Sequence, residues 1–425
     1  MGLVEIAGYY SNLKRGFDEI GIESVFVDLS GHPFKYNSST PPNFLVKLAM
    51  WIGKKRVSTS RTNLLIRMWW AGLQEILMIP LFIWAVTKYD TFIFGFSSGF
   101  FRYHSYDLPI LKWLNKRIIY VFHGSDSRPV YLDGGIMATG SLTVETCIKL
   151  THKQKRQLQK IERYANIIVS HPLSAQLHEK KFVPFLLMGL PYNIRHTSFP
   201  LEQILDHDSV RLLHSPSYPE AKGTFKIREV IQNLQAKGYL IEFIEVTGKP
   251  NAIVLNELAK CDFVIDQLYS DTPMAGFAAE AALFGKPAVV GGYGQTEFER
   301  TIPSDRLPPS HYCYPDELET AIEKLILDKP YRLEVGQRAR QFVETYWTPK
   351  QVAQRFLHLI KGDIPEAWQY DPQDIRYLHG WALSEARTRQ LVRAIIETGG
   401  KEALQLTDKP ELERMFIEFA GLETT

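Results

Sequence analysis

The sequence predicts an α/β protein made of two Rossmann-like domains that face each other across a cleft, followed by a helical tail. Short apolar runs alternate with helical segments through most of the 425 residues, which is typical of parallel sheets covered by helices. Loop-forming residues gather once, over 184–200, where Gly189, Pro191 and Asn193 indicate a linker between two such series. The length also suits two or three domains rather than one.

These patterns divide the chain into four parts. We expect an N-terminal domain over 1–190, a C-terminal domain over 200–345, a helix that crosses back over 346–362 and a helical tail over 363–425. In the first domain, strands are expected at 24–28, 91–95, 117–122 and 166–170, and helices at 10–20, 108–115 and 153–164. In the second, strands are expected at 210–214, 242–246, 263–266 and 288–290, and helices at 223–237, 251–260, 276–284, 315–327 and 331–346. The crossover helix is expected at 351–360, and the tail helices at 374–385, 388–398 and 410–419.

Composition excludes several classes of protein. With 45% hydrophobic and 23% charged residues the chain is globular, and a net charge of +2 argues against a dedicated nucleic-acid binder. Cys147, Cys261 and Cys313 fit neither a zinc site nor a disulfide framework, which favours a reducing compartment. The first residues show no secretory signal. We therefore expect a cytoplasmic protein.

An apolar stretch at 68–86 approaches the length of a membrane span. Gln74, Glu75 and Pro80 interrupt it, so a buried or interfacial helix is favoured over a transmembrane one. Lysines, arginines and tryptophans interleave around it, and such a segment can rest on an anionic membrane surface. An apolar helix that covers a sheet beside a solvated basic loop explains the pattern equally well. Peripheral contact through 44–86, at the inner face of the membrane, is thus one open interpretation.

The most informative stretch is 266–292, which reads as strand end, loop, helix, turn and strand. Gly276 and Phe277 begin a helix of small residues that contains Glu280, and Gly285 ends it. An acid on such a helix, facing a strand's carboxyl end, can accept hydrogen bonds from a ribose diol. The alternative is a solvated helix residue, but the alanines around Glu280 indicate tight packing.

Polar residues also follow two other strands. His123, Asp126 and Arg128 lie on one turn after 117–122; they can contact a sugar or an acceptor hydroxyl, or form a structural turn in which Asp126 caps the next helix. After 210–214, Ser215 opens a loop that leads to Lys222, Gly223 and Thr224, where a helix begins.

A helix N-terminus with a lysine beside it is suited to a diphosphate, although a solvated lysine before an N-cap threonine would look the same. The backbone of the loop at 270–276, with Asp271, Thr272 and Gly276, can cradle a transferred sugar or a distal phosphate.

Together these motifs resemble the GT-B glycosyltransferases, specifically the family 4 ("group 1") type. The resemblance covers roughly residues 3–360 and rests on VEIAGYYSNL at 4–13, FHGSD at 122–126, HSPS…KGT at 214–224 and DQLYSD…GFAAEAALFGKPAVVGG at 266–292. It implies transfer of a sugar from a nucleoside-diphosphate sugar, with retention and without metal or cofactor. The acceptor would be a glycan, a lipid-linked molecule or another hydroxyl compound.

The resemblance also implies roles for individual residues. Lys222 would contact the donor diphosphate, Glu280 the ribose and His123 the donor sugar at the catalytic centre. Gly8 would lie on the loop near the acceptor, with Tyr9 and Arg128 on the same side.

The chain departs from the family pattern at three points. Thr272, with Asp271 beside it, stands where the family has the first of two glutamates. Ser217, Tyr218 and Pro219 stand where an arginine usually accompanies the lysine. The family begins with a buried strand, for which Met1 to Leu3 leave almost no room. We therefore expect that strand to be short or missing, as in a truncated product, with a sheet edge exposed.

Two other functions compete with transfer. A nucleotide-sugar epimerase would need several carboxylates around the donor sugar, and the cleft offers few. A catalytically degenerate homologue, binding partners or scaffolding polysaccharide assembly, would explain the lost acid, the lost arginine and the missing strand. Retention of Lys222, Glu280 and His123 argues for the enzyme.

Overall fold

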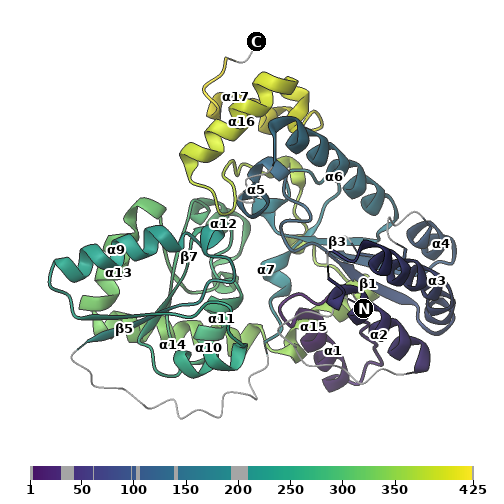
Figure 1. Cartoon of the computed structure of the whole chain (residues 1–425), viewed down its shortest axis with the longest axis horizontal. Helices are drawn as coiled ribbons and strands as arrows, with labels where there is room; N and C mark the ends of the chain where they lie inside the picture. Colours follow the sequence, from purple (N-terminus) through teal and green to yellow (C-terminus); the bar gives the residue numbers. More distant parts are fainter. Residues whose placement is uncertain are drawn as a thin grey trace.

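Two parallel sheets form the centre of the molecule in a computed structural model that describes residues 3–29, 43–60, 62–96, 98–101, 106–137, 142–192 and 209–423. The first sheet has the strand order β1-β2-β3-β4 and the second β6-β5-β7-β8-β9. They lie in separate domains, to the right and the left of Figure 1, and the tail sits above both. The predicted α/β architecture of two Rossmann-like domains with an appended helical tail is confirmed.

The elements of the N-terminal domain are α1 (Tyr9–Glu19), α2 (Phe44–Ser58), α3 (Leu64–Lys88), β1 (Thr91–Gly95), α4 (Asp107–Trp113), β2 (Arg117–Val121), α5 (Gly134–Met137), α6 (Val144–Tyr164), β3 (Ile167–Ser170), β4 (Val183–Pro184) and α7 (Phe185–Met188). Its strands are buried on both faces, as the continuous apolar runs require. Among the described helices, α3 alone is long and apolar enough to cross a membrane by composition, and 28% of its most apolar window is buried.

The elements of the C-terminal domain are β5 (Val210–His214), α8 (Pro219–Lys222), α9 (Thr224–Ala236), β6 (Ile241–Glu245), α10 (Asn251–Leu258), β7 (Phe263–Ser270), α11 (Gly276–Leu283), β8 (Ala288–Gly292), α12 (Gln295–Thr301), β9 (His311–Cys313), α13 (Leu318–Leu327) and α14 (Lys329–Tyr346). Strand β7 continues four residues beyond Asp266, where the sequence predicted its end. The extra residues carry the chain toward the other domain.

Helix α15 (Pro349–Lys361) leaves the second domain and packs on α1 of the first. Val352 and Phe356 of α15 share one buried cluster with Leu13 and Phe17 of α1. Gly16 permits this approach, because a Cβ there would collide with the backbone of Pro349. The chain thus crosses between the domains twice.

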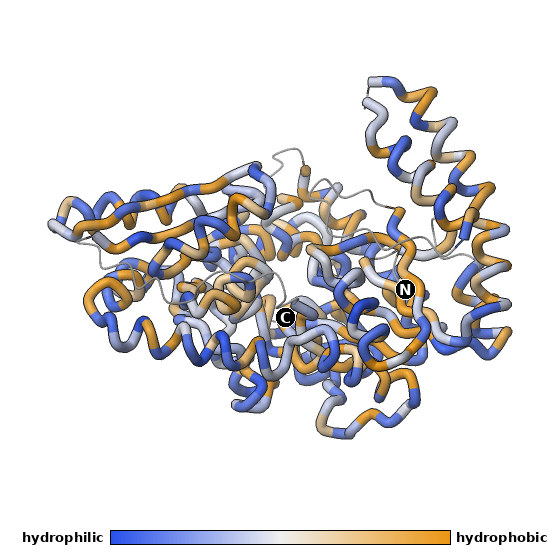
Figure 2. Tube along the Cα trace, turned by 90° about the horizontal axis from the view of Figure 1, so that it is seen from below, coloured by the Kyte–Doolittle hydropathy of each residue, from blue (hydrophilic) through white to orange (hydrophobic). Residues whose placement is uncertain are grey.

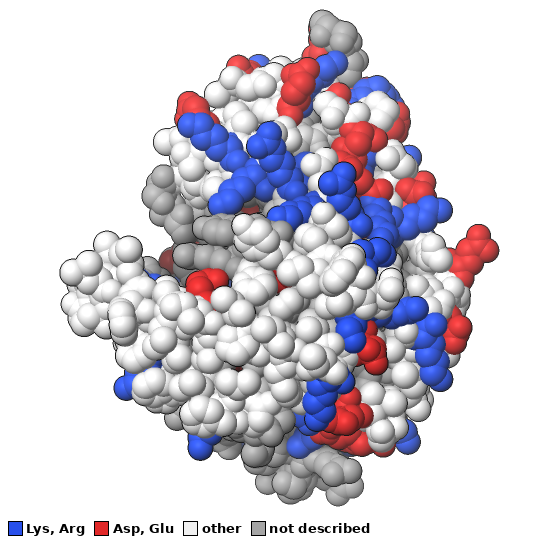
Figure 3. All heavy atoms as spheres, turned by 90° about the vertical axis from the view of Figure 1, so that its right-hand side faces the viewer, with Lys and Arg blue, Asp and Glu red and all other residues white. Residues whose placement is uncertain are grey.

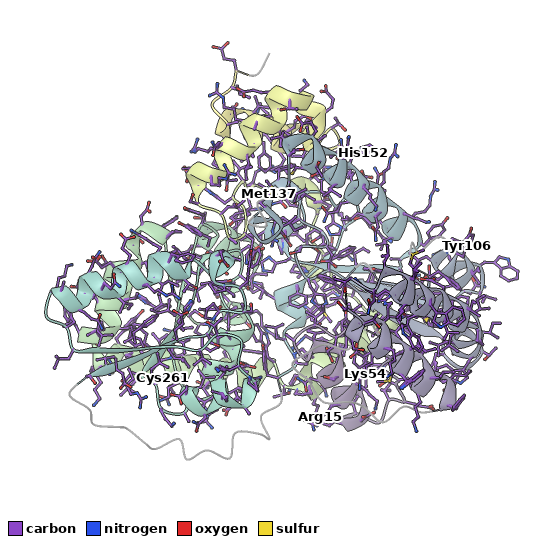
Figure 4. The ribbon with its side chains drawn as sticks, in the orientation of Figure 1. Arg15, Lys54, Tyr106, Met137, His152 and Cys261 are labelled. Atoms are coloured by element: carbon purple, nitrogen blue, oxygen red, sulfur yellow. The ribbon has the colours of Figure 1, made fainter. Side chains whose placement is uncertain are left out.

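The tail is part of the N-terminal core. Helices α16 (Glu385–Gly399) and α17 (Pro410–Phe419) contribute Val392, Ile395 and Phe416 to the cluster that contains Tyr131. The Tyr131 hydroxyl donates to the Leu404 carbonyl at 3.1 Å, and His152 of α6, labelled in Figure 4, is hydrogen-bonded to Gln405.

Before α16, an extended segment bridges both domains. The Ala382 N–H donates to Tyr269 of β7 at 2.9 Å, and the N–H of Gly134, in the N-terminal domain, donates to Trp381 at 2.8 Å.

Three local predictions are wrong. Residues 24–28 are extended but form no strand: the Leu29 N–H donates to the Leu3 carbonyl, and a cavity of about 310 Å³ separates the segment from β1. Residues 375–384 are not helical, because their backbone is used in the bridge between domains. Helix α6 begins nine residues earlier than its periodicity indicated, where Thr143 caps it. Among the described residues no strand precedes α1, and β1 is an edge of its sheet.

Truncating Phe416 tests the tail as part of the core. Its ring is fully buried and meets Tyr131 edge-on, 6.3 Å between centroids. We expect Phe416→Ala to lower the free energy of unfolding by about 3–5 kcal/mol, from lost transfer energy and a cavity. Leu240→Ala, at a side chain that is 64% exposed, should change it by less than about 0.5 kcal/mol. Equal urea midpoints for the two variants would show that the tail does not share the core.

Candidate functional site

A cavity of about 210 Å³ lies between the two domains. Its N-terminal wall follows the carboxyl ends of β2 and β3, and its C-terminal wall follows β7 and the start of α11. The lining side chains and backbone come from Ile6, Ala7, Tyr9, Phe122, His123, Gly124, His171, Ser174, Phe185, Leu186, Leu190, Pro191, Tyr192, Asp271, Thr272, Met274, Ala275 and Gly276. The cavity is therefore where open α/β sheets place their ligands.

His123 lines the cavity at the end of β2. Its Nε2 lies 3.0 Å from the Tyr10 hydroxyl, and the rings of Tyr9, Tyr10 and Phe185 surround it edge-on. Burial among these rings lowers the pKa of His123 to about 3, so the imidazole is neutral at physiological pH. A neutral imidazole can donate a hydrogen bond to a sugar hydroxyl or accept one from it. It does so without placing a charge among the surrounding aromatic rings.

Asp126 shapes the turn that carries His123. Its Oδ1 accepts from the His123 N–H at 2.8 Å, and its Oδ2 is buried without a hydrogen-bond partner among the described residues. Burial raises the pKa of Asp126 to about 7. The carboxyl group therefore positions the turn directly; a role in contact with an acceptor stays a prediction.

The start of α1 closes the N-terminal side of the cavity. Gly8 caps the helix with φ of 81°, in the left-handed region that favours glycine. Tyr9 stacks on Phe185 with 5.5 Å between centroids, and its buried hydroxyl has no hydrogen-bond partner among the described residues. A ligand oxygen in the cavity is one partner that would satisfy this hydroxyl.

Arg128 and Asp271 join the two domains. Arg128 is buried; it donates to Asp133 at 3.0 Å within its own domain and to Asp271 across the interface, and it lies over the Trp381 ring of the tail. The Arg128 charge contributes most to keeping the pKa of Asp271 below its ordinary value despite burial. In this arrangement Arg128 is held away from any acceptor, and the Asp271 oxygen that meets it is occupied.

The loop after β5 places four predicted donor residues. Lys222, at the end of α8, reaches Asp266 Oδ1 at 3.3 Å and Gln267 Oε1 at 2.6 Å and stays partly exposed. Gly223, with φ of 73°, begins α9 without a side-chain cap, which leaves helix N–H groups unsatisfied by side chains.

The other two predicted donor residues of this loop, Thr224 and Ser215, are hydrogen-bonded within the domain. The Thr224 hydroxyl is buried against His214 at 2.9 Å, and Ser215 donates to the Val246 carbonyl. Lys222 and Gly223 thus remain the two that present a charge and a helix end.

Helix α11 presents Glu280 one turn behind the cavity. Glu280 accepts from Asn251 Nδ2 at 3.0 Å, and burial raises its pKa to about 7. No side chain caps the helix, so its first N–H groups have no side-chain acceptor. Gly276 at this helix start lines the cavity, and its carbonyl accepts from the Tyr192 hydroxyl.

Thr272 and Phe277, which the sequence also assigned to the donor site, lie in different environments. Thr272 lines the cavity and Phe277 packs into the domain core.

Several residues of the site were missed from the sequence. His171 follows β3 as His123 follows β2; it lines the cavity with a buried Nε2 that has no partner among the described residues, and burial lowers its pKa to about 4. Its place after a predicted strand was a signal that could have found it. Tyr192 and Asn251 reach the site through tertiary contacts that the sequence does not encode locally.

Neither metal clusters nor reactive thiols accompany these groups in the described ranges. No three of their His, Cys, Asp and Glu residues gather in a metal-binding group. The three cysteines are buried and unpaired, and burial raises the pKa of Cys147 to about 11 and of Cys261 and Cys313 to about 12. These thiols are therefore not activated as nucleophiles.

Comparisons with known proteins return structures alone. No family model and no curated protein matches the sequence. Among solved structures, the chain is similar to Anabaena HepE in complex with UDP-glucose, at 13% identity over 67% of this chain and 82% of that one, with a TM-score of 0.42. It is similar to the glycotransferase of kitacinnamycin, at 14% identity over 86% and 98%, with a TM-score of 0.43. It is also similar to an alpha-glucosyltransferase in complex with UDP and DNA, at 12% identity over 85% and 97%, with a TM-score of 0.46.

The raised pKa of Glu280 gives a pH-dependent prediction. A carboxyl whose pKa is about 7 when folded and near 4.5 when unfolded binds its proton more tightly in the folded state, so it destabilises the fold as pH rises from 4.5 to 7. We expect Glu280→Gln to remove this penalty, worth at most roughly 2–3 kcal/mol, and to raise the melting temperature at pH 8 relative to the natural chain. At pH 4, where the carboxyl group is largely protonated in both states, the two should melt alike. The opposite order at pH 8 would contradict the burial of this carboxylate.

Asp271→Asn tests the ion pair between the domains. The variant leaves Arg128 buried with one carboxylate partner, and we expect the free energy of unfolding to fall by about 1–3 kcal/mol. The radius of gyration from small-angle scattering should rise as the domains separate. Asp305→Asn removes a partner from Arg306 at an exposed site and should change neither quantity measurably. An unchanged radius in Asp271→Asn would show that other contacts hold the cleft.

Proposed function

We propose that the protein is a glycosyltransferase that moves a sugar from a nucleoside-diphosphate sugar to a hydroxyl acceptor. One observation carries the proposal: the cavity between the carboxyl ends of two parallel sheets brings a neutral His123 from one domain opposite the loop 271–276 and the uncapped start of α11 from the other. A polar ring facing a helix N-terminus across a closable cleft suits a sugar linked to phosphate.

The donor is placed by the C-terminal domain. Glu280 accepts hydrogen bonds from the ribose diol, and the N–H groups at the start of α11, with Thr272, meet the distal phosphate or the transferred sugar. The uncapped start of α9 and the Lys222 ammonium face the diphosphate. Lys222 exchanges its contacts with Asp266 and Gln267 for phosphate oxygens, a short movement for a flexible side chain.

The reaction retains configuration and needs no covalent intermediate on the protein. The acceptor hydroxyl attacks the anomeric carbon on the face that the diphosphate leaves; the new carbon–oxygen bond forms as the bond to the diphosphate breaks. The hydroxyl proton passes to a phosphate oxygen, which then carries it away. Lys222 and the α9 N-terminus stabilise the charge that develops on the leaving group, so no metal ion is required by this scheme.

The acceptor enters from the N-terminal wall. Ala7 and Tyr9, on either side of Gly8, border the cavity there, and its apolar lining from Phe185, Leu186 and Leu190 favours an acceptor with an apolar part, such as a lipid-linked glycan. The unpartnered Tyr9 hydroxyl and His171 Nε2 are available to orient acceptor or sugar hydroxyls.

A degenerate homologue is the second candidate, and two contacts favour it. Asp271, beside the position of the family's first glutamate, is paired with Arg128, and Lys222 is paired with Asp266. If these pairs are permanent, the cleft binds no donor and the protein acts as a scaffold.

Calorimetry with UDP, GDP and their common sugars separates the two functions. Saturable binding to the natural chain that is lost in Glu280→Ala supports the transferase, and the base that binds identifies the donor. A folded chain that binds none of these nucleotides would favour the scaffold.

Removing Lys222 tests the leaving-group contact. With a donor identified, we expect Lys222→Ala to lower kcat for transfer or donor hydrolysis about 100-fold or more, the scale of losing one preorganised donor in the transition state. Lys226→Ala is the matched control, because Lys226 lies one turn further along α9, is exposed and pairs with Glu229. Equal kcat values for the natural chain and Lys222→Ala, with both folded by thermal melt, would remove Lys222 from the mechanism.

A further inference from the structure

Helix α3 is apolar on two opposite sides. Its inner side, at Gln74, Met78, Leu81, Phe82 and Ala85, is buried against the N-terminal domain. Its outer side exposes a stripe of large apolar side chains at helical spacing, of which Leu65 is 81% and Trp69 68% exposed. The stripe consists of Leu65, Trp69, Ile76, Ile79 and Ile83. Monomeric soluble proteins rarely expose an apolar row of this length, and such surfaces mark sites of interaction with proteins or membranes.

Helix α2 extends the same apolar surface. Its Trp51 is exposed and meets Trp70 of α3 edge-on, 5.5 Å between centroids, and Phe44 is exposed at its start. The two helices form a hairpin that protrudes from the body at the upper right of Figure 2, where apolar residues colour much of its length. Lys54 and Lys55 lie exposed on the second half of α2. Apolar and cationic groups thus share the hairpin.

Helix α6 carries a row of cations on its outer side. The row is Lys149, Lys153, Arg156, Lys160 and Arg163, which recur every three or four residues and therefore line one face. None of the five forms a salt bridge with a described residue. Lys155, on the inner face of the same helix, is buried and paired with Glu179 and Asp408. The outer row thus has no salt bridge among the described residues, and its nearest acid on the helix is Glu145, one turn before Lys149, whereas the inner lysine has two partners.

The apolar stripe and the cationic row belong to one side of the molecule. Helices α3, α4 and α6 form the right-hand side of Figure 1, and Figure 3 looks onto it: a broad area almost free of charge lies below a band of lysine and arginine. Helix α4 fills the space between them and exposes Trp113, which is 79% accessible, and Lys112. Tyr106, just before α4, stands out from the right-hand edge in Figure 4.

We propose that this face docks on the surface of an anionic lipid bilayer. The α3 stripe and Trp113 enter the boundary between head groups and acyl chains, and the α6 row meets the anionic head groups. Helix α3 does not cross the bilayer in this arrangement, because the inner side of its second half, from Gln74 to Ala85, is buried against the protein core. The proposal concerns location and does not depend on nucleotide binding.

Charge favours the bilayer over a second copy of the chain. A two-fold dimer through this face would bring two α6 rows of five cations to one interface, where like charges repel. A spanning α3 would have to leave the core and carry the buried Gln74 into hydrocarbon. An anionic surface satisfies both the apolar stripe and the unpaired cations without either cost.

Co-sedimentation of the full chain with phosphatidylcholine vesicles, with and without 30% phosphatidylglycerol (about a third of the lipid anionic), tests the proposal. We expect binding to the anionic vesicles that falls with added salt, and little binding to the neutral ones. The triple variant Lys153→Gln, Arg156→Gln, Lys160→Gln should weaken partitioning on the order of 100-fold, since each cation near an anionic surface contributes roughly fivefold. Trp69→Ser with Ile76→Ser should weaken it by at least about tenfold.

Matched variants on other faces serve as controls. Lys249→Gln with Lys350→Gln removes two exposed cations outside α2, α3, α4 and α6, and Leu240→Ser with Leu327→Ser removes two exposed apolar side chains of the C-terminal domain. Both should bind vesicles as the natural chain does. The substituted positions are exposed except for the half-buried Lys160, and thermal melts verify that each variant is folded.

Three outcomes would overturn the proposal. Equal binding of the natural chain to neutral and anionic vesicles would remove the role of the α6 row. Retention on vesicles after washing at alkaline pH would show that α3 spans the bilayer. Absence of vesicle binding, together with a dimer that Trp69→Ser and Ile76→Ser dissociate, would assign the face to self-association. Nucleotide calorimetry in solution is unaffected by any of these results, so a failure here is distinguishable from a failure of the proposed function.

Discussion

The buried Arg128 guanidinium is the contact on which the arrangement of the cleft depends. It joins Asp133 of its own domain to Asp271 of the other and lies over Trp381 of the tail. A cation enclosed by protein is stable where carboxylates compensate it, so the closed cleft, the loop after β7 and the bridge at 381–382 are fixed together. Opening the cleft must separate Arg128 from Asp271, which makes this pair the main electrostatic cost of ligand entry.

Three carboxylates near the cleft differ in protonation because their neighbours differ. Asp271 has a cation in contact, and its pKa is lowered. Asp126 is buried and Glu280 is half-buried, each with neutral donors, and the pKa of each is raised to about 7. Desolvation outweighs hydrogen bonding at these two positions. Carboxyl groups poised near neutrality gain most from a ligand that donates hydrogen bonds, which is the property expected of a site for polyols and ribose.

The N-terminal domain has two surfaces of different character that are separate in space. The carboxyl ends of β2 and β3 face the cleft, whereas α3, α4 and α6 cover the opposite side of the sheet and face outward (Figure 1). A domain that holds an acceptor on one side and an anionic membrane on the other would receive lipid-linked substrates at short range. The apolar outer side of α3 is costly in water, and a membrane is the environment in which that cost disappears.

Local sequence determined the elements and the position of the site along the chain. Apolar runs identified the strands at 91–95, 117–122 and 210–214, of which the second ends one residue earlier in the structure. Small residues with a C-cap glycine identified the helix of Glu280, because buried parallel strands and capped helices are local patterns. Strand ends predicted His123 in the same way. Tertiary structure decided which of the predicted site residues are free to contact a ligand and which are bound to other residues of the protein.

The ion pair of Arg128 with Asp271 joins positions 143 residues apart, and no local pattern encodes it. Local sequence also does not encode the hydrogen bond from Tyr192 to Gly276. Nor does it encode the non-helical backbone at 375–384, whose hydrogen-bond partners are distant in sequence. Periodicity specified that α3 is apolar; only packing decided which of its two apolar sides the core covers and which is left to the surroundings.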